Sequence, residues 1–564
     1  MSSKPIDAVI IGAGFAGLYM THRLRNVLGI DVRVFEAGET VGGTWFWNRY
    51  PGARCDSESY TYCFSFSDEL LEEWDWTCKY PEQKQLLAYL EHVADRFDLR
   101  RSIEFDTRVL SAEFVDETGL WRVTTNRDEH VHARFLVSAI GALSIAPYTP
   151  HFHGIESFQG KWYHTADWPH EPVDFSGKRV GVIGTGSSGV QTIPVVAEQA
   201  EHVTVFQRTA QYSIPANHDT FTEDMWRDIK SHYRELWDKA QQSAGGFPWE
   251  HNGKGALEVD DQERQATYEK MWREGGMKFA LGSFKDISYD PAANETASNF
   301  IKRKIREAVR DPETAEALIP DHPFWARRPI VDTNYYQTYN RNNVALVDLK
   351  KTPIIEVTPD GVRTSTGVVP LEILIFATGF DAITGPFFNI DLRGYHGLTI
   401  RDKWAHGGST YLGLMTSGFP NFFMVGGPGS TTGNVPLTLE THGDWIADCI
   451  DYMRCNGINL IEASAEAENE WTDYVQERAQ NSMLAHANSW INGANIPGKT
   501  RFYNFYLGHF GRYRKQLQDI AQQGYPGFEM DRVPVRKKTP APGSDAATRP
   551  GHGSFERLTA THLA

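Results

Sequence analysis

Two glycine-rich segments constrain the fold of this chain more than any other feature. Gly12-Ala-Gly14-Phe-Ala-Gly17 follows the apolar run 8–11, and Gly184-Thr-Gly186-Ser-Ser-Gly189 follows the apolar run 179–183; both precede residues at helical spacing. In a strand–turn–helix unit of this kind, the three glycines permit a tight turn, close backbone approach to a pyrophosphate, and close packing of helix on strand. The pyrophosphate then lies on the N-terminal amides of the helix. The sequence therefore predicts an α/β protein with two Rossmann-like dinucleotide-binding domains.

The residues after the second strand of each unit differ between the two units. Residues 31–35 end at Glu36, close to the ~20-residue offset at which an acid binds ribose hydroxyls. In the second unit, residues 203–206 are followed by Gln207-Arg208-Thr209. A carboxylate would repel a 2′-phosphate, whereas an arginine and a hydroxyl can bind one. We therefore expect a dinucleotide with a free ribose in the first unit, and a preference for NADPH over NADH in the second.

Composition and charge exclude several classes of protein. The 564 residues suffice for several domains, and the net charge of -16 argues against nucleic acid or an anionic membrane as the main partner. The 5 cysteines have no CxxC spacing, so we expect neither a disulfide framework nor a metal site. This cysteine usage fits a reducing compartment. We find no secretion signal and no long apolar run, so we expect a soluble, cytoplasmic and monomeric protein without a membrane span.

The order of these patterns predicts the domain organisation. Apolar residues at helical spacing, among them Phe221, Met225 and Trp226, indicate one helical face in a region between strand patterns. The end of the chain is rich in Pro, Gly, Ser, Thr and Ala, which is typical of disorder. We expect a first nucleotide domain from residues 1–145 and 386–533, a second from residues 146–218 and 320–385, a helical insertion at 219–319, and a disordered tail at 534–564.

Two further segments combine charged and aromatic residues. Residues 42–66 are rich in Gly, Pro and aromatics, and an ordered loop of this kind could stack on a ring system and place Asp56 beside it. Residues 325–336 contain Arg327-Arg328-Pro329. Paired arginines most often form a solvated face, but the flanking Trp325 and Pro329 disfavour free exposure.

The stretch between the two glycine-rich segments connects these observations. It reads Phe158-Gln-Gly160-Lys-Trp-Tyr-His164-Thr-Ala-Asp-Trp168-Pro169. It resembles the fingerprint FxGxxxHxxxW of the type I Baeyer–Villiger monooxygenases, flavoproteins that use NADPH and oxygen. The flanking motifs stand in the order of that family, and the resemblance extends from near Pro5 to near Met530. Further segments that resemble the family are 43–56, 327–329, 377–379 and 490–499.

This resemblance implies one site for FAD and one for NADPH. The implied FAD-binding residues are Gly12, Gly14, Gly17, Glu36, Thr44, Trp45, Trp47, Asp56, Tyr62 and Val109. The implied NADPH-binding residues are Thr185, Gly186, Ser187, Ser188, Gly189, Gln191, Arg208, Thr209, Arg327, Arg328 and Trp490. Arg327 stands where the family usually has lysine, which is not an equivalent donor. Because the positive charge is kept, we expect the NADPH preference to survive.

The implied reaction inserts one oxygen atom from O2 next to a ketone carbonyl and gives an ester or lactone, through NADPH-reduced FAD and a C4a-peroxyflavin. An anionic nucleophile and a tetrahedral oxyanion both need positive charge that is fixed before reaction. Arginine supplies it because it keeps its proton at any operating pH. Our hypothesis is that Arg328 is this catalytic cation and that Asp56 holds it in place.

The expected substrate loop is segment 427–437, whose predicted pocket residues are Thr431, Thr432, Gly433 and Leu437. The first three are small where relatives often carry an aromatic residue, which suggests room for bulky or cyclic ketones. The stretch with Phe158, Gly160, His164 and Trp168 is expected to be a linker between domains that move relative to each other. His164 would then fix this linker by hydrogen bonds rather than transfer protons.

Three other readings stay open at this point. A related flavin monooxygenase that oxidises nitrogen or sulfur would share both nucleotide motifs, although Trp168 favours the ketone branch. A disulfide reductase would need a closely spaced cysteine pair, whereas Cys55 and Cys63 lie eight residues apart. A non-enzymatic sensor could bind both nucleotides, but it would consume no NADPH in response to a ketone.

Overall fold

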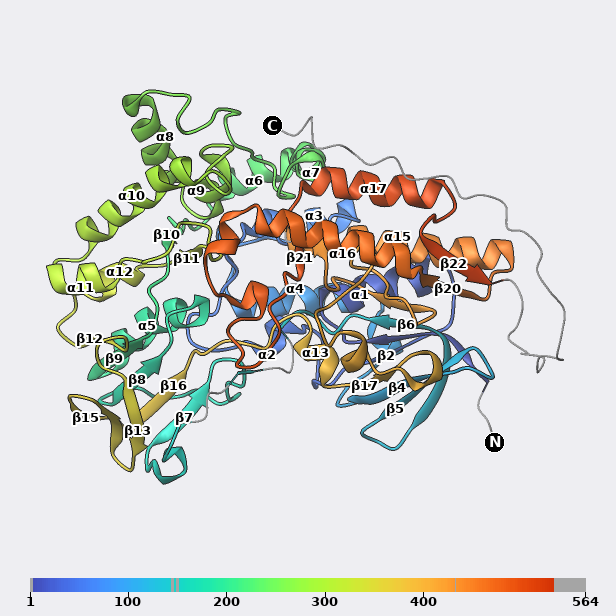
Figure 1. The fold of residues 1–564 in the computed structure, drawn as a ribbon, viewed down its shortest axis with the longest axis horizontal. Coiled ribbons are helices and arrows are strands. Elements are labelled where there is room, and N and C mark those ends of the chain that lie inside the picture. The colour runs from blue at the N-terminus through green and yellow to red at the C-terminus, as the bar shows by residue number, and fades with distance from the viewer. Residues whose placement is uncertain (1–3, 144–146, 149–151, 432, 532–564) are drawn as a thin grey trace.

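A computed structural model describes residues 4–143, 147–148, 152–431 and 433–531. Thr432 and the tail 534–564 therefore lie outside the described residues. Figure 1 shows two sheets at opposite sides of the molecule, one around β8, β9 and β16 and the other around β2, β4, β5 and β6. Among the described residues, no helix combines the length and the apolar character needed to cross a bilayer.

The first sheet is built around the first glycine-rich segment. β1 (Ile6–Ile11) lies between β2 (Val32–Phe35) and β6 (His130–Ser138) and is parallel to both. The order continues through β5 (Leu120–Thr125), β4 (Val109–Val115) and β17 (Asp391–Arg393) on one side and β3 (Ile103–Glu104) on the other, and β18 (Phe422–Met424) pairs with β6. Helix α1 (Phe15–Thr21) starts after Gly14 and packs on α15 (Val435–Asn456).

The second sheet repeats the same unit and is wholly parallel. Its order is β12 (Val344–Asp348), β9 (His202–Gln207), β8 (Arg179–Ile183), β16 (Ile373–Phe376) and β7 (Lys161–His164). Helix α5 (Ser187–Gln199) starts after Gly186. The predicted α/β fold with two dinucleotide-binding domains is confirmed. Strands from residues 6–138 and 391–424 share the first sheet, while the exact domain limits remain a prediction.

The fingerprint stretch, which we expect to be a linker between domains that move relative to each other, contributes a strand to the second sheet. Residues 161–164 form β7, the edge strand of the second sheet, in parallel register with β16. Trp168 is buried against Tyr163, with ring centroids 5.2 Å apart, and near Phe175. Added side-chain bulk at Gly160 would meet the carbonyl oxygen of Glu372 at 2.3 Å. The stretch is therefore part of the second domain. Its adjacent aromatic residues favour a β-strand.

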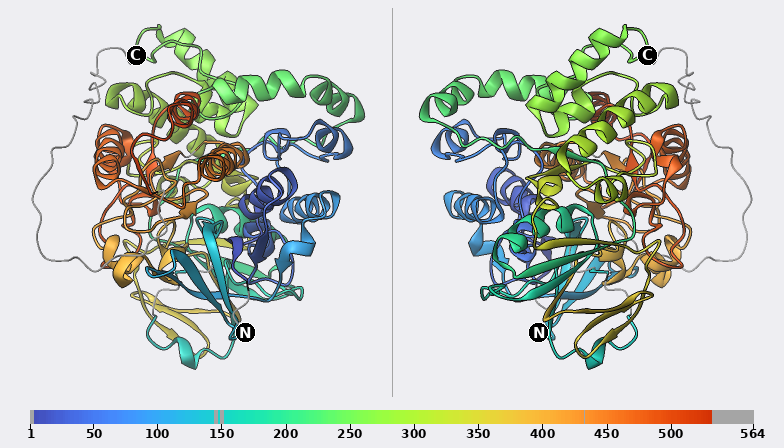
Figure 2. Two further views of the ribbon diagram at one scale, coloured as in Figure 1. Left: turned by 90° about the vertical axis from the view of Figure 1, so that its right-hand side faces the viewer. Right: turned by 90° about the vertical axis from the view of Figure 1, so that its left-hand side faces the viewer.

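The region between the two parts of the second domain is helical, as predicted. It contains α6 (Glu223–Ser231), α7 (Tyr233–Gln242), α8 (Asp261–Glu274), α9 (Met277–Gly282), α10 (Pro291–Ala308) and α11 (Pro312–Ala317). Figure 2 shows these green helices gathered at one end of the molecule. The predicted continuous apolar face is wrong in detail, because the helix breaks at His232 and Met225 is 43% exposed.

The remaining elements surround the two sheets. They include α2 (Thr44–Trp47), α3 (Asp68–Glu73), α4 (Gln83–Arg96), α12 (Tyr335–Thr338), α16 (Ala465–Gln480) and α17 (Phe510–Gln522), the strand pairs β10 (Ser213–Pro215) with β11 (Ile330–Asp332) and β19 (Ser430–Thr431) with β21 (Phe505–Tyr506), and the antiparallel set β13 (Ile354–Thr358), β14 (Gly361–Thr364) and β15 (Gly367–Pro370).

Candidate active site

One large cavity, of ≈ 3500 Å³, is lined by residues of both nucleotide domains and of the helical insertion. From the first domain come Phe15 and Ala16, which lie between the second and third glycines of the first glycine-rich segment. The second domain contributes Gly184 to Ser188, and the insertion contributes Phe247 and Trp249. Groups bound to the two glycine-rich turns would therefore meet in one space.

The first glycine-rich turn has no space for side chains. Gly12 has φ +100°, and a methyl group there would lie 2.6 Å from the carbonyl oxygen of Ala139. A methyl group on Gly17 would lie 1.9 Å from the carbonyl oxygen of Gly12. On Gly14 it would lie 3.3 Å from the Cα atom of Gly43. Helix α1 can therefore approach β1 closely only with these residue types.

Glu36 lies at the end of β2, beside this turn. Its side chain is buried, and its two carboxyl oxygens accept hydrogen bonds from the backbone amides of Ala13 (2.7 Å) and Gly38 (2.8 Å). Burial raises the pKa of this carboxyl group, although the two amides oppose the shift. The predicted ribose-binding acid is therefore held against the glycine-rich turn.

The second unit presents arginines at the corresponding edge. Arg208 and Arg327 both line the cavity. Burial and, after it, the charge of Arg208 lower the pKa of Arg327. The Nε atom of Arg327 is buried with no hydrogen-bond partner among the described residues. Two like charges with an unused donor form a place where an anion would be stabilised.

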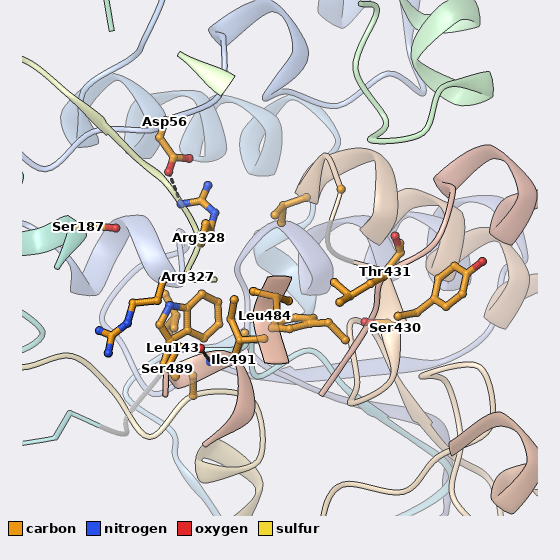
Figure 3. Close-up of a pocket in the computed structure, with 18 of the residues that line it drawn as sticks. Asp56, Leu143, Ser187, Arg327, Arg328, Ser430, Thr431, Leu484, Ser489 and Ile491 are labelled. Carbon is orange, nitrogen blue, oxygen red and sulfur yellow. Dashed lines mark hydrogen bonds and ion pairs between the residues drawn. The ribbon is translucent and has the colours of Figure 1, made fainter. Parts of the chain in front are cut away.

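Arg328 points away from Arg327 and toward Asp56 (Figure 3). Its Nη1 atom lies 2.5 Å from Oδ2 of Asp56, and the two side chains are 35% and 21% exposed. The charge of Asp56 raises the pKa of Arg328 above its already high value. The pair therefore keeps a protonated guanidinium at the cavity wall, oriented by one carboxylate.

Most of the other predicted cofactor residues line the same cavity. These are Thr44, Trp45, Tyr62, Thr185, Gly186, Ser187, Ser188, Gln191, Thr209 and Trp490. The rings of Trp45 and Tyr62 are nearly perpendicular, with centroids 5.8 Å apart. Trp47 packs on Phe46 and Val109 is buried in β4; neither belongs to the cavity lining.

The predicted substrate loop is only partly exposed to the cavity. Thr431 and Gly433 line it, but a methyl group on Gly433 would lie 2.5 Å from the carbonyl oxygen of Gly245. The backbone of the insertion therefore fills the space that the small residue was expected to leave. Leu437 is buried, and its neighbours Val435, Thr438 and Leu439 line the cavity instead. Asn434 caps α15 here by accepting a hydrogen bond from the Leu437 amide at 3.2 Å.

His164 makes hydrogen bonds at the end of β7. Its Nδ1 atom accepts a hydrogen bond from the Ala166 amide at 3.0 Å, so Nε2 carries the proton. Nε2 lies 3.2 Å from both the Tyr148 carbonyl oxygen and Oγ1 of Thr378. Burial lowers the pKa of His164, which favours the neutral ring. This geometry fixes the fingerprint stretch to the segment after β16. His164 itself does not line the cavity, whereas its partners Tyr148 and Thr378 do.

Sequence reasoning missed how the Asp56 loop is held. Gln191 accepts a hydrogen bond from Tyr50 Oη (2.9 Å) and donates one to the Arg54 carbonyl oxygen (3.1 Å). Gly52 has φ +80°, and a methyl group there would lie 2.3 Å from the carbonyl oxygen of Gln191. The sequence Pro51-Gly52 indicates a turn. Nothing in the local sequence indicates that this turn contacts Gln191 on α5.

The segment with Trp490 is also fixed to the second domain. Lys499 forms an ion pair with Asp381, and Asn495 donates a hydrogen bond to the Phe380 carbonyl oxygen at 2.8 Å. The Trp490 ring packs edge-on against Phe505, with centroids 5.7 Å apart. These contacts hold Trp490 at the cavity between the two glycine-rich turns.

Known proteins share both the sequence and the fold. Residues 6–227 match a family described as flavin-binding monooxygenase-like. A Baeyer–Villiger monooxygenase of Pseudooceanicola batsensis is 45% identical over 93% of this chain and 96% of its own. A phenazine N-monooxygenase of Lysobacter antibioticus is 43% identical over 94% and 97%.

A solved structure of an oxidised steroid monooxygenase bound to NADP is 49% identical, with a TM-score of 0.90 over 93% of this chain and 99% of that one. The chain therefore belongs to the family of Baeyer–Villiger monooxygenases.

Proposed function

We propose that the protein uses FAD, NADPH and O2 to insert one oxygen atom beside the carbonyl group of a cyclic or bulky ketone, giving a lactone or ester. The observation that carries this proposal is the Arg328–Asp56 pair on the wall of a cavity shared by both glycine-rich turns. We further expect a monomer located in the cytoplasm.

The first domain fits FAD. Its turn excludes side chains at Gly12 and Gly17, which suits a pyrophosphate on the N-terminus of α1, and Glu36 suits a ribose without a phosphate. Trp45 and Tyr62 offer aromatic surface to a ring system where the domains meet. FAD supplies the oxygen activation that no amino-acid side chain offers.

The second domain fits NADPH. Its turn has the same tight packing at Gly184 and Gly189. The unpartnered, buried Nε of Arg327 and the neighbouring charge of Arg208 suit a 2′-phosphate. Arginine at position 327 supports the expectation that NADPH preference survives without the usual lysine.

Arg328 and Asp56 would then act on the ketone. Attack on a carbonyl group places negative charge on its oxygen, and a fixed cation stabilises that charge without having to reorganise. Arg328 stays protonated because Asp56 raises its pKa further. Asp56 holds the guanidinium group in one orientation by its 2.5 Å contact. Both side chains would be oriented before the ketone arrives.

The substrate class follows from the shape of the cavity and from the relatives. The similarity to a steroid monooxygenase supports a large polycyclic ketone. The small side chain of Thr431 on the cavity wall agrees with this, whereas Gly433 adds no space.

The test is a ketone panel with Arg328→Ala. We expect ester formation to fall at least about a hundredfold, the effect of removing one donor from a preorganised oxyanion site. Product mass and NADPH consumption are read together. Arg327→Ala is the matched control, because at saturating NADPH it should still form ester. Near-normal ester formation by Arg328→Ala would refute the assignment.

A second candidate is oxidation of nitrogen, because a phenazine N-monooxygenase is among the close relatives. It is favoured less, since Trp168 matches the ketone-oxidising fingerprint and the Baeyer–Villiger relative is more similar. Adding phenazine and an alkyl sulfide to the panel separates the two functions. Turnover of these compounds without any ester product would favour the second.

A further inference from the structure

Glu58 is a buried carboxylate that the proposed reaction does not use. It follows Asp56 by two residues, and its side chain is only 2% exposed. The indole N–H of Trp249 donates a hydrogen bond to its Oε2 atom at 2.9 Å. The Nζ atom of Lys278 lies 3.5 Å from its Oε1 atom. A buried carboxylate is tolerated only with partners of this kind.

Both partners belong to the helical insertion, and each comes from a different part of the cavity wall. Trp249 lies in the wall segment 244–253, and Lys278 is on α9, next to the cavity-lining Met277. Trp249 itself lines the cavity and stacks on Phe247, with ring centroids 4.9 Å apart and an interplanar angle of 9°. The Glu58 carboxylate therefore contacts both segment 244–253 and helix α9.

The backbone of Glu58 is fixed to the first domain. Its carbonyl oxygen accepts hydrogen bonds from the amides of Thr61 (2.9 Å) and Tyr62 (3.0 Å), and Tyr62 lines the cavity. The next residue, Ser59, donates a side-chain hydrogen bond to the Cys78 carbonyl oxygen at 2.8 Å. The position of the Glu58 carboxylate is thus tied to the loop that carries Asp56.

We propose that Glu58 is a positioning residue that sets the separation between the Phe247–Trp249 wall and the Asp56–Arg328 pair, and thereby the size of ketone that reacts. This inference rests on the proposed function. When the Trp249 hydrogen bond is removed, the stacked pair is free to move away from the reacting carbonyl. The cavity then discriminates less against larger ketones.

The chain offers a matched control for a purely structural role. Asp75 of the first domain accepts a hydrogen bond from the Trp226 indole at 2.6 Å and pairs with Lys230 at 2.6 Å. This second cluster also combines a carboxylate, a tryptophan and a lysine, and it too joins the insertion to the first domain. None of its three members lines the cavity. Disrupting the Asp75 cluster perturbs the contact between the insertion and the first domain but changes no residue of the cavity wall.

The experiment compares Trp249→Phe with Trp226→Phe in the FAD-loaded enzyme. Each substitution removes one indole N–H and keeps an aromatic ring. We measure kcat and KM for a small cyclic ketone and for a polycyclic ketone. We expect Trp249→Phe to raise the ratio of kcat/KM for the polycyclic ketone to kcat/KM for the small ketone by about threefold to tenfold, the scale of the net contribution of one typical hydrogen bond. Trp226→Phe should leave the ratio unchanged.

Two further variants test Glu58 itself. Glu58→Gln keeps an acceptor for the Trp249 indole and should stay close to wild type in the ratio, whereas Glu58→Ala should behave like Trp249→Phe. Equal ratios in all variants, or equal shifts in Trp226→Phe and Trp249→Phe, would overturn the inference. If the wild-type enzyme forms no ester from any ketone, the proposed function fails instead, which is a separate outcome.

Discussion

The two glycine-rich turns have almost the same structure. In each, the first glycine faces the carbonyl oxygen of an alanine that follows a neighbouring strand: Gly12 faces Ala139 and Gly184 faces Ala377. In each, the third glycine faces the carbonyl oxygen of the first, at 1.9 Å for Gly17 and 2.2 Å for Gly189 measured from an added Cβ atom. Close packing of strand, turn and helix therefore requires the same residues in both units.

The two units differ at the end of their second strands. The Glu36 carboxylate faces the glycine-rich turn and accepts hydrogen bonds from the backbone amides of Ala13 and Gly38. At the equivalent position Gln207 donates its side-chain amide to the Ala317 carbonyl oxygen at 2.7 Å, away from the turn. The middle glycines differ as well, because Gly14 is packed against Gly43, whereas Gly186 has no atom within 4 Å of an added Cβ.

This comparison separates the scaffold from the choice of cofactor. The glycines are needed for the backbone to close, whichever dinucleotide binds. We propose that the choice rests on the Glu36 carboxylate in one unit and on Arg208 and Arg327 in the other, because charge distinguishes a ribose hydroxyl from a phosphate. Substitutions of matched residues in the two units should therefore have different consequences.

The largest effect is expected from alanine at the third glycines. Gly17→Ala forces α1 away from β1 and should abolish FAD binding, with a stability loss of about 1–3 kcal/mol or more. Gly189→Ala should abolish NADPH use while FAD stays bound. Flavin absorbance after gel filtration and NADPH kinetics distinguish the two. Stoichiometric FAD in Gly17→Ala would contradict the shared packing requirement.

The next effect concerns charge in the second unit. Arg208→Ala should lower kcat/KM for NADPH about tenfold to a hundredfold and leave NADH unchanged, the scale of one charge-assisted hydrogen bond. Steady-state kinetics with both nucleotides measures this. Arg179→Ala is the control, because Arg179 begins β8 and so lies at the end of that strand opposite to the glycine-rich turn. An equal loss with NADH would mean that Arg208 does not contact the 2′-phosphate.

A third prediction concerns β7, which extends the second sheet beyond β16 and carries the fingerprint. His164→Ala leaves the Tyr148 carbonyl and Thr378 without their ring partner, a loss of about 1–3 kcal/mol. We expect slower ester formation per NADPH consumed, with both cofactors retained. Coupling measurements and flavin content test this, with Thr378→Ser as a control that keeps the hydroxyl group. Loss of FAD would refute a role confined to the second domain.

The smallest effect is on pH dependence in the first unit. Burial raises the folded-state pKa of Glu36 above its unfolded value, so its stabilising contribution is complete at low pH. It is lost as the pH rises from about 4.3, the ordinary value, through the raised pKa. Glu36→Gln, which copies the second unit, should flatten this dependence.

The measurement for Glu36 is urea unfolding of the FAD-free protein at several pH values. Gln207→Glu in the second unit is the reciprocal variant, because it adds a carboxyl group where the wild-type chain has a buried amide. Parallel pH profiles for wild type and Glu36→Gln would show that Glu36 is not the group responsible.

Local sequence was sufficient for much of the fold. Strand–glycine–helix patterns predicted β1 with α1 and β8 with α5, because glycine placement and apolar runs act within about 30 residues of chain. The helical insertion was predicted for the same reason. The strand in the stretch after Phe158 was not predicted, because β7 is too short to show a period and its partner β16 lies more than two hundred residues further along.

The candidate site was predicted less evenly. The family resemblance led to the prediction that Asp56 holds Arg328 in place. In the structure, Nη1 of Arg328 lies 2.5 Å from Oδ2 of Asp56. Leu437 was expected in the pocket but is buried outside the cavity lining. Gly433 lines the cavity as expected but adds no space, because the backbone of Gly245 lies against it. Glu58 was missed, since a carboxylate in a loop carries no sign of its distant partners. Gln191 was predicted as a cofactor residue, but its contacts with the Asp56 loop were not.

The sequence by itself determined two dinucleotide units and their different charge at the ribose end, because these depend on residues close together in the chain. Only the tertiary structure decided how the units face one cavity, which side chains line it, and that Glu58 joins the insertion to the Asp56 loop. Such contacts join segments separated by about two hundred residues, and their energies arise only when folding removes water from both partners.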